Sequence, residues 1–392
     1  MKQIAAIVIA AALLALPAAS PAADPFEIYA DLPLTGQVAF IGSQTAKALA
    51  ALELYVNAHG GINGRPIKIV ISDDQSSPQV AVQIMNQLLT KKPAIIFGGL
   101  LAAICNASSG VIKDDGPVLY CYTPGVHPPP GSWVYSSGYS TVDIFATGVR
   151  YFRERDLTKI AIISTTDASG QESGPTMAGI LARPENRSIV LTDHEQFAVT
   201  DLSVAAQLER IKNSGAQVLI TWVSGTPFGT VMRGMRDAGI AIPVLSSQAN
   251  MNYSQLEGYR SILPNAPVYF PGIPALVPDA IPNRGVHSAI DDFVAAMKTQ
   301  NVALPDTGEA LAWDSMLIAI DAYKHLGFDA TPAQMRDYIN KVRGRQGIYG
   351  IVDFAKTPQR GMSADWCVVV RWNPDTSRFV AVSKPGGTPT GQ

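Results

Sequence analysis

The residues of this chain that could do chemistry lie in short polar turns, each of which follows an apolar run. Such turns cover residues 37–41, 100–106, 122–127, 168–171, 224–228 and 248–250. A turn between a strand and a helix presents backbone N–H groups, short hydroxyls and the positive end of the helix, which together can hold an anion. Any single residue among them could serve only to cap its helix, but the set as a whole predicts a ligand-binding cleft.

Sequence signatures of catalysis are missing. No glycine-rich dinucleotide loop follows a strand, and the chain has no phosphate-binding P-loop, no HExxH and no GxSxG sequence. The histidines lack the spacing of metal ligands, and we expect His194 to lie in a surface loop. These observations favour a binding protein over an enzyme, and we expect neither a cofactor nor a metal.

Strands and helices that alternate along the chain must position these turns. The segment from Pro33 to Pro78 shows this most clearly. Apolar residues recur at helical spacing from Leu49 to Val56, and Ser43 or Thr45 is the expected N-cap. Alternating isoleucines then predict a strand from Ile67 to Ile71.

The alternation continues in two similar series, which predict two lobes. Each lobe is expected to be a doubly wound α/β unit with a mostly parallel central sheet. The predicted strands are 26–32, 67–71, 94–97, 118–122 and 134–137 in the first series, and 160–164, 189–192, 217–222 and 243–246 in the second. The last third of the chain adds predicted helices at 286–299, 308–326 and 331–342, and short strands at 347–354, 366–372 and 379–382.

The segment from Pro33 to Pro78 closely resembles the start of the type I periplasmic binding proteins. The matching elements, in this order and spacing, are PLTG at 33–36, GGINGRPI at 60–67 and the acid pair Asp73–Asp74 before Pro78. The branch that it resembles is the leucine/isoleucine/valine-binding one, which serves ABC importers. The segment Gly347–Phe354 is similar to the last strand pair of that family, so the resemblance extends over nearly the whole chain after residue 23.

The resemblance implies two lobes joined by a hinge that the chain crosses three times. By this likeness the N-terminal lobe comprises residues 24–142 and 274–347, and the C-terminal lobe residues 143–273 and 348–392. A small ligand would bind between the lobes, and an inner-membrane ABC permease would be the protein partner. We expect the receptor itself to be a monomer.

The chain departs from its amino-acid-binding relatives at the ligand turns. Those relatives hold the ligand carboxylate with a serine and a threonine of the first lobe, and the ammonium with an acid of the second. Here Ala102 and Ala103 stand at the expected serine, His127 near the expected threonine and Gln248 near the expected acid. Because an unpaired buried ammonium costs several kcal/mol, we expect weak binding of leucine-like ligands.

The turn Thr166–Gln171 points to another ligand class, because it is similar to the turn of relatives linked to uptake of aromatic acids. We therefore expect a small organic acid, aromatic and benzoate- or hydroxycinnamate-like. An amide- or urea-type ligand, a branched-chain amino acid and a sensor role are the alternatives. An exported enzyme is the least favoured interpretation.

The residues expected to contact the ligand form an apolar and aromatic pocket with a few polar groups. His127 could bind a carboxylate if protonated, or could instead lie exposed in its proline-rich loop. The expected ligand-binding residues are Gln37, Phe40, Leu101, Ala102, Ala103, Tyr122, Thr123, His127, Ser169, Gly170, Ser224, Phe228 and Gln248.

The chain has three cysteines. Cys105 and Cys121 both fall at the predicted carboxyl edge of the first sheet, so a disulfide between them is favoured over two buried thiols. Cys367 lies in an apolar run and is expected to be a buried free thiol.

Composition and the first residues indicate where the protein works. The net charge is −2 without a basic block, so nucleic acid is not an expected partner. Residues 1–23 are typical of a cleaved secretory signal, since the apolar run is too short for a comfortable membrane anchor. No cysteine lies at this junction to carry a lipid, so we expect a protein of the periplasm.

Overall fold

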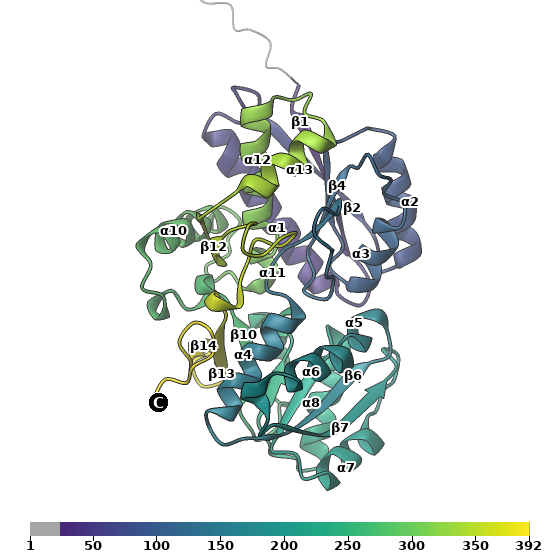
Figure 1. Ribbon diagram of the computed structural model, residues 1–392, viewed down its shortest axis with the longest axis vertical. Helices are drawn as coiled ribbons and strands as arrows, with labels where there is room; N and C mark the ends of the chain where they lie inside the picture. The colour runs from purple at the N-terminus through teal and green to yellow at the C-terminus, as the bar shows by residue number, and fades with distance from the viewer. Residues whose placement is uncertain (1–23, 392) are drawn as a thin grey trace, which may run out of the picture.

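The chain folds around two separate sheets in a computed structural model that describes residues 24–391 (Figure 1). The first sheet has the strand order β2-β1-β3-β4-β5, and all of its pairs are parallel. Helices α2 and α3 lie on one side of it, and α1 and α12 on the other (Figure 1). The elements are β1 Phe26–Leu32, α1 Ala39–Ala58, β2 Ile67–Asp73, α2 Pro78–Leu89, β3 Ile95–Gly98, α3 Ala102–Ser109, β4 Val118–Cys121 and β5 Val134–Ser136.

Helix α1 begins earlier than expected, and the predicted caps at Ser43 and Thr45 are wrong. The N-cap is Val38, whose own side chain caps nothing. Its backbone N–H donates instead to the Ser76 hydroxyl at 3.3 Å, so the next loop of the chain supplies the capping oxygen. The Thr45 hydroxyl lies inside the helix and donates to the carbonyl oxygens of Ile41 and Gly308.

The second sheet has the order β14-β13-β10-β9-β8-β6-β7, parallel from β7 to β10 and antiparallel beyond β10. Its strands and helices come from the middle and the end of the chain. They are α4 Thr141–Arg153, β6 Lys159–Thr165, α5 Ala168–Gln171, α6 Ser173–Leu181, β7 Val190–Phe197, α7 Ala205–Asn213, β8 Val218–Trp222, α8 Thr226–Asp237, β9 Val244–Ser246, α9 Tyr253–Gly258, β10 Val268–Gly272, β13 Val368–Asn373 and β14 Arg378–Ala381.

Two features of this sheet differ from the prediction. Strand β10 was not expected, because prolines at 267 and 271 suppress a strand pattern. His194 does not lie in a surface loop but in strand β7, where its Nε2 lies 3.3 Å from the Ser164 hydroxyl and 3.2 Å from that of Ser173. Burial lowers the pKa of His194, which favours the neutral ring.

The last third of the chain returns to the first lobe and then leaves it. Helices α10 Arg284–Lys298, α11 Thr307–Ala310 and α12 Trp313–Leu326 all contact α1, and α13 Pro332–Lys341 contacts β4. A hairpin of β11 Arg345–Gly347 and β12 Gly350–Val352 follows. The chain thus passes between the lobes after β5, after β10 and between β12 and β13, which confirms the predicted two-lobe fold with three crossings.

The cysteines behave as expected. Cys105 and Cys121 form a disulfide with a Cα–Cα distance of 6.0 Å, which joins α3 to the end of β4. Cys367 is buried and free. No helix within residues 24–391 is both long and apolar enough to cross a membrane, and the predicted signal at residues 1–23 lies outside the described residues.

Two buried carboxyls meet beneath the loop that leads into α1. Asp31, in β1, is 1% exposed, and Asp74, which directly follows β2, is fully buried. Burial, strengthened by the charge of Asp74, raises the pKa of Asp31 to about 8, and burial raises the pKa of Asp74 to about 6. Asp31 is therefore the group that keeps its proton near neutral pH, while one oxygen of Asp74 accepts the Ser76 N–H.

We expect this pair to make the folded protein less stable as the pH rises from about 5 to 8.5. A carboxyl whose folded pKa is raised contributes stability below its unfolded pKa, and this contribution is lost as the pH passes the folded pKa. Over this pH range the free energy of unfolding should fall by at least about 1.4 kcal/mol less in Asp31→Asn than in the wild type, because a difference of one pKa unit corresponds to that energy. Urea unfolding at both pH values measures this. The exposed carboxylate variant Asp279→Asn should follow the wild-type pH profile, and an Asp31→Asn profile equal to both would contradict the proposed titration.

Candidate ligand-binding cleft

A cavity of about 40 Å³ lies between the two lobes. Its lining residues share one position in the fold, since each lies at or just after the carboxyl end of a parallel strand (β1, β3 or β4 in the first lobe, β6, β8 or β9 in the second). The first lobe contributes Gln37, Leu100, Leu101, Thr123, Pro124 and Gly125, and the second Thr165, Asp167, Ser169, Glu172, Trp222, Val223, Ser224, Ser247 and Ala249.

The structure brings five of the predicted residues together around this cavity: Gln37, Leu101, Thr123, Ser169 and Ser224. The other predicted residues lie beside or behind the lining. Phe228 is buried against the rings of Tyr259 and Phe270, and the Gln248 amide donates to the carbonyl oxygen of Pro271 at 3.2 Å. The remaining predicted residues are Ala102, Tyr122 and Gly170, which are buried, Phe40 and Ala103, which are half-buried, and His127, which is exposed.

Glu172 is one of the lining residues that were not among the predicted ligand-binding residues. Its Oε1 accepts from the Thr141 hydroxyl at 2.6 Å and from the Trp222 indole N–H at 3.2 Å. Its Oε2 lies 3.3 Å from Nε2 of His127, which reaches it from the first lobe. The available signal was an acid at the N-cap of α6, one residue beyond the turn that resembles the aromatic-acid relatives.

Asp167 places a second carboxylate in the same wall. Its Oδ1 accepts from the Thr165 hydroxyl at 2.7 Å and from the Gly170 N–H at 3.1 Å, so it caps the short helix α5. The second-lobe wall therefore carries two carboxylates. Among the residues described, no lysine or arginine lines the cavity to balance them.

The first-lobe wall has the opposite character. Helix α3 begins at Ala102 after Leu101, and no side chain caps its first turn. The first N–H groups of a helix have no partner within the helix, and they carry the positive end of its dipole. Leu100 and Leu101, which directly precede the helix, line the cavity, so the start of α3 lies at the cavity wall. The cavity thus has a donor pole on the first lobe and a carboxylate pole on the second.

The two lobes are closed on each other. The Gln37 side-chain amide donates to the carbonyl oxygen of Ser224 at 3.3 Å, and the Asn252 amide donates to Oε1 of Gln44 at 2.6 Å. A cavity of about 40 Å³ holds only a few water molecules. The lobes must therefore move apart before an organic molecule can enter.

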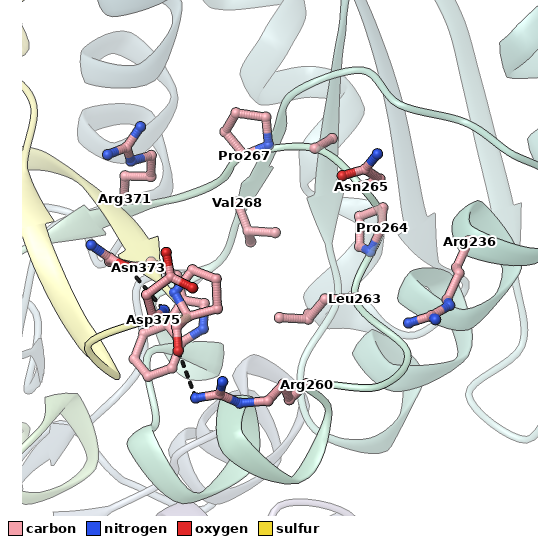
Figure 2. A pocket seen from close by; sticks show the side chains of 13 residues that line it. Arg236, Arg260, Leu263, Pro264, Asn265, Pro267, Val268, Arg371, Asn373 and Asp375 are labelled. Carbon is pink, nitrogen blue, oxygen red and sulfur yellow. Dashed lines mark hydrogen bonds between the residues drawn. The ribbon is translucent and has the colours of Figure 1, made fainter.

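A larger hollow of about 610 Å³ lies elsewhere on the second lobe, at the start of β10 and the end of β13 (Figure 2). This is the opposite edge of the sheet from the cleft, and none of the predicted ligand residues line it. Figure 2 shows Arg236, Arg260 and Arg371 at separate edges of the hollow. Arg260 donates a hydrogen bond to the carbonyl oxygen of Pro374. The three arginines do not converge on one point of the hollow.

Comparison with known proteins gives one family and a consistent set of neighbours. The model of a family described as periplasmic binding protein matches residues 32–377. The leucine-, isoleucine-, valine-, threonine- and alanine-binding protein of Pseudomonas aeruginosa is 26% identical over 233 residues, 56% of this chain and 60% of that protein. The Leu/Ile/Val-binding protein of Escherichia coli is 24% identical over 263 residues, 63% of this chain and 70% of that protein. The chain thus spans about three-fifths of the length of the first of these curated relatives.

Solved structures share the fold. An extracellular ligand-binding receptor of Rhodopseudomonas palustris HaA2 superposes with a TM-score of 0.80 at 20% identity, covering 91% of this chain and 99% of the receptor. A solute-binding protein of an ABC transporter from R. palustris, in complex with benzoate, superposes with a TM-score of 0.75 at 16% identity, covering 94% and 98%. These likenesses show a two-lobe fold of the same type.

The contact between Gly225 and Gln37 makes closure testable. Gly225 has a φ of +76°, and a Cβ added there would lie 2.7 Å from the backbone oxygen of Gln37 in the other lobe. We expect Gly225→Ala to hold the lobes apart and to increase the radius of gyration in solution X-ray scattering. The control is Gly215→Ala, because Gly215 has a φ of +71° but open space around it.

Both variants should lose about 1–2 kcal/mol of stability from the positive φ. Only Gly225→Ala should change the radius of gyration. Equal values for the wild type and both variants would show that the closed contact is not formed by the free protein in solution.

Proposed function

The chain belongs to the periplasmic binding protein family, and from that membership we propose that it is the solute-binding protein of an ABC importer. It captures a small molecule in the periplasm by closing two lobes around it, and it delivers the molecule to an inner-membrane permease as a monomer. The cavity enclosed between the carboxyl edges of two parallel sheets supports this role, because open α/β sheets bind ligands at that edge. The family is one of binding proteins, so the ligand should leave chemically unchanged.

The ligand that suits the cavity is a small organic acid with a flat apolar body and a hydroxyl at its far end, such as a hydroxybenzoate or a hydroxycinnamate. The observation that carries this proposal is the pair of unlike poles. A carboxylate would lie at the uncapped start of α3, where backbone N–H groups and the helix dipole favour an anion. The hydroxyl would donate to the carboxylate pole at Glu172.

The walls between the poles support an apolar ligand body. Leu100 and Leu101 come from one lobe, and Trp222 and Val223 from the other. Ligand pockets are commonly apolar with a few polar groups that fix orientation, as here. The benzoate complex of the R. palustris solute-binding protein shows that a protein of this fold accommodates an aromatic acid.

A branched-chain amino acid is the second candidate, and Glu172 is the observation in its favour. A carboxylate of the second lobe that lines the cavity could pair with an ammonium. Glu172 already accepts from Thr141 and Trp222 and lies beside His127, which leaves room for one further donor such as a hydroxyl but not for the three donors of an ammonium. The relatives named for leucine, isoleucine and valine keep this candidate open to test.

A thermal-shift panel tests the function directly. The protein is heated with benzoate, 4-hydroxybenzoate, a hydroxycinnamate, leucine and simple amides in turn. A ligand at a hundred times its dissociation constant should add about 2.7 kcal/mol to the folded state. We expect the hydroxylated aromatic acids to stabilise most and to be recovered unchanged. Stabilisation by leucine alone would overturn the proposed ligand class, and turnover of a ligand would overturn the binding role.

The variant Glu172→Gln separates the two ligand candidates. Its amide oxygen still accepts a hydroxyl, and the variant loses the repulsion between two anions, so affinity for 4-hydroxybenzoate should stay the same or increase. Leucine would lose the counter-charge of its ammonium and bind more than about tenfold more weakly. Isothermal titration measures both. Glu185→Gln, an exposed carboxylate of the same lobe, is the matched control and should bind both ligands like the wild type.

A further inference from the structure

Arg360 is a buried cation in the segment where the chain crosses between the lobes for the third time. Its guanidinium donates only to backbone carbonyl oxygens. One terminal nitrogen donates to Pro124 at 3.3 Å and Val126 at 2.6 Å, and the other to Ser137 at 3.4 Å and Gly138 at 3.2 Å. No carboxylate within residues 24–391 lies at ion-pair distance from it.

A buried charge without an ion-pair partner is costly, so its presence calls for a role. Burial lowers the pKa of Arg360 to about 10, and Asp143 and Glu172 raise it from a greater distance. The guanidinium is therefore still protonated at neutral pH. Burying this charge costs free energy that a neutral side chain would not cost, so we expect the charge itself to have a role.

The carbonyls that Arg360 holds belong to the first-lobe wall of the cavity and to the first crossing between the lobes. Thr123, Pro124 and Gly125 line the cavity, whereas Arg360 does not. A trans peptide is planar, so a carbonyl aimed at the guanidinium turns the N–H of that peptide to the opposite side. Arg360 thus orients the dipoles of the 124–126 turn with their positive ends directed away from itself.

We propose that Arg360 is a positioning residue that adds the 124–126 turn to the donor pole formed by the start of α3, and so makes the first-lobe wall of the cavity selective for anions. It fixes the 124–126 turn against residues 137–138 of the first crossing, and its charge adds to the positive potential of that turn. The proposal rests on the proposed function for the ligand that the pole receives. A lysine could not replace it, because an ammonium has three donors and lacks the planar fork that spans two pairs of carbonyls.

The first experiment needs no ligand. Amide hydrogen exchange is compared for the wild type, Arg360→Lys and Arg360→Met, and for Arg371→Met as a control. Arg371 is exposed, and no hydrogen bond or ion pair of its side chain occurs in the part of the chain that the structure describes. We expect faster exchange at residues 123–127 and 136–139 in both Arg360 variants, with β7 and the Arg371 variant unchanged. Exchange that is unchanged in the two segments of a folded Arg360→Lys protein would overturn the positioning role.

The second experiment measures the charge preference by isothermal titration with 4-hydroxybenzoate and its neutral analogue 4-hydroxybenzamide. In Arg360→Met the affinity for the anion should fall about tenfold more than that for the amide, since one nearby charge is lost. In Arg360→Lys the anion-to-amide ratio should stay closer to that of the wild type. Equal losses for both ligands would overturn the selectivity role. If the wild type binds neither ligand, the proposed ligand class fails while the exchange data still decide the role of Arg360.

Discussion

Parallel pairing of strands is the constraint on which this molecule depends. The register that joins β1 to β2 and β3, and β3 to β4, brings the carboxyl ends of all four strands to one edge. The second sheet does the same for β6, β8 and β9. The two edges face each other across the cavity, and residues far apart in sequence, such as Gln37 and Ser224, come into hydrogen-bond contact. Every functional feature described above is a consequence of that meeting of edges.

Much of the fold could be predicted from local sequence patterns, and the predictions that failed did so for physical reasons. Alternating isoleucines and helical spacing located most strands and helices, and the disulfide followed from two cysteines expected at one sheet edge. The start of α1 was missed because its N–H is capped by Ser76, which lies 38 residues further along the chain. Strand β10 was missed because Pro271 breaks the pattern, although the sheet needs no N–H from that residue to hold the strand.

The candidate site was predictable at the level of turns rather than side chains. The likeness to a known family and the order of the elements identified the turns that surround the cavity. Five of the predicted ligand-binding residues line it. The direction of a side chain depends on contacts made after folding, which a single sequence does not contain. Gln248 turns toward Pro271, while Glu172 reaches the cavity because Thr141 and Trp222 hold it there. Which of these side chains touch a ligand is still a prediction.

The disulfide between Cys105 and Cys121 has a consequence for binding thermodynamics. It joins the helix start that follows β3 to the end of β4, so the two first-lobe turns that line the cavity are linked covalently. Ordering loops on ligand capture costs conformational entropy, and a cross-link removes part of that cost before any ligand arrives. The reduced chain would therefore fold to a looser binding surface. The oxidised cross-link would thus strengthen binding without adding any contact to a ligand.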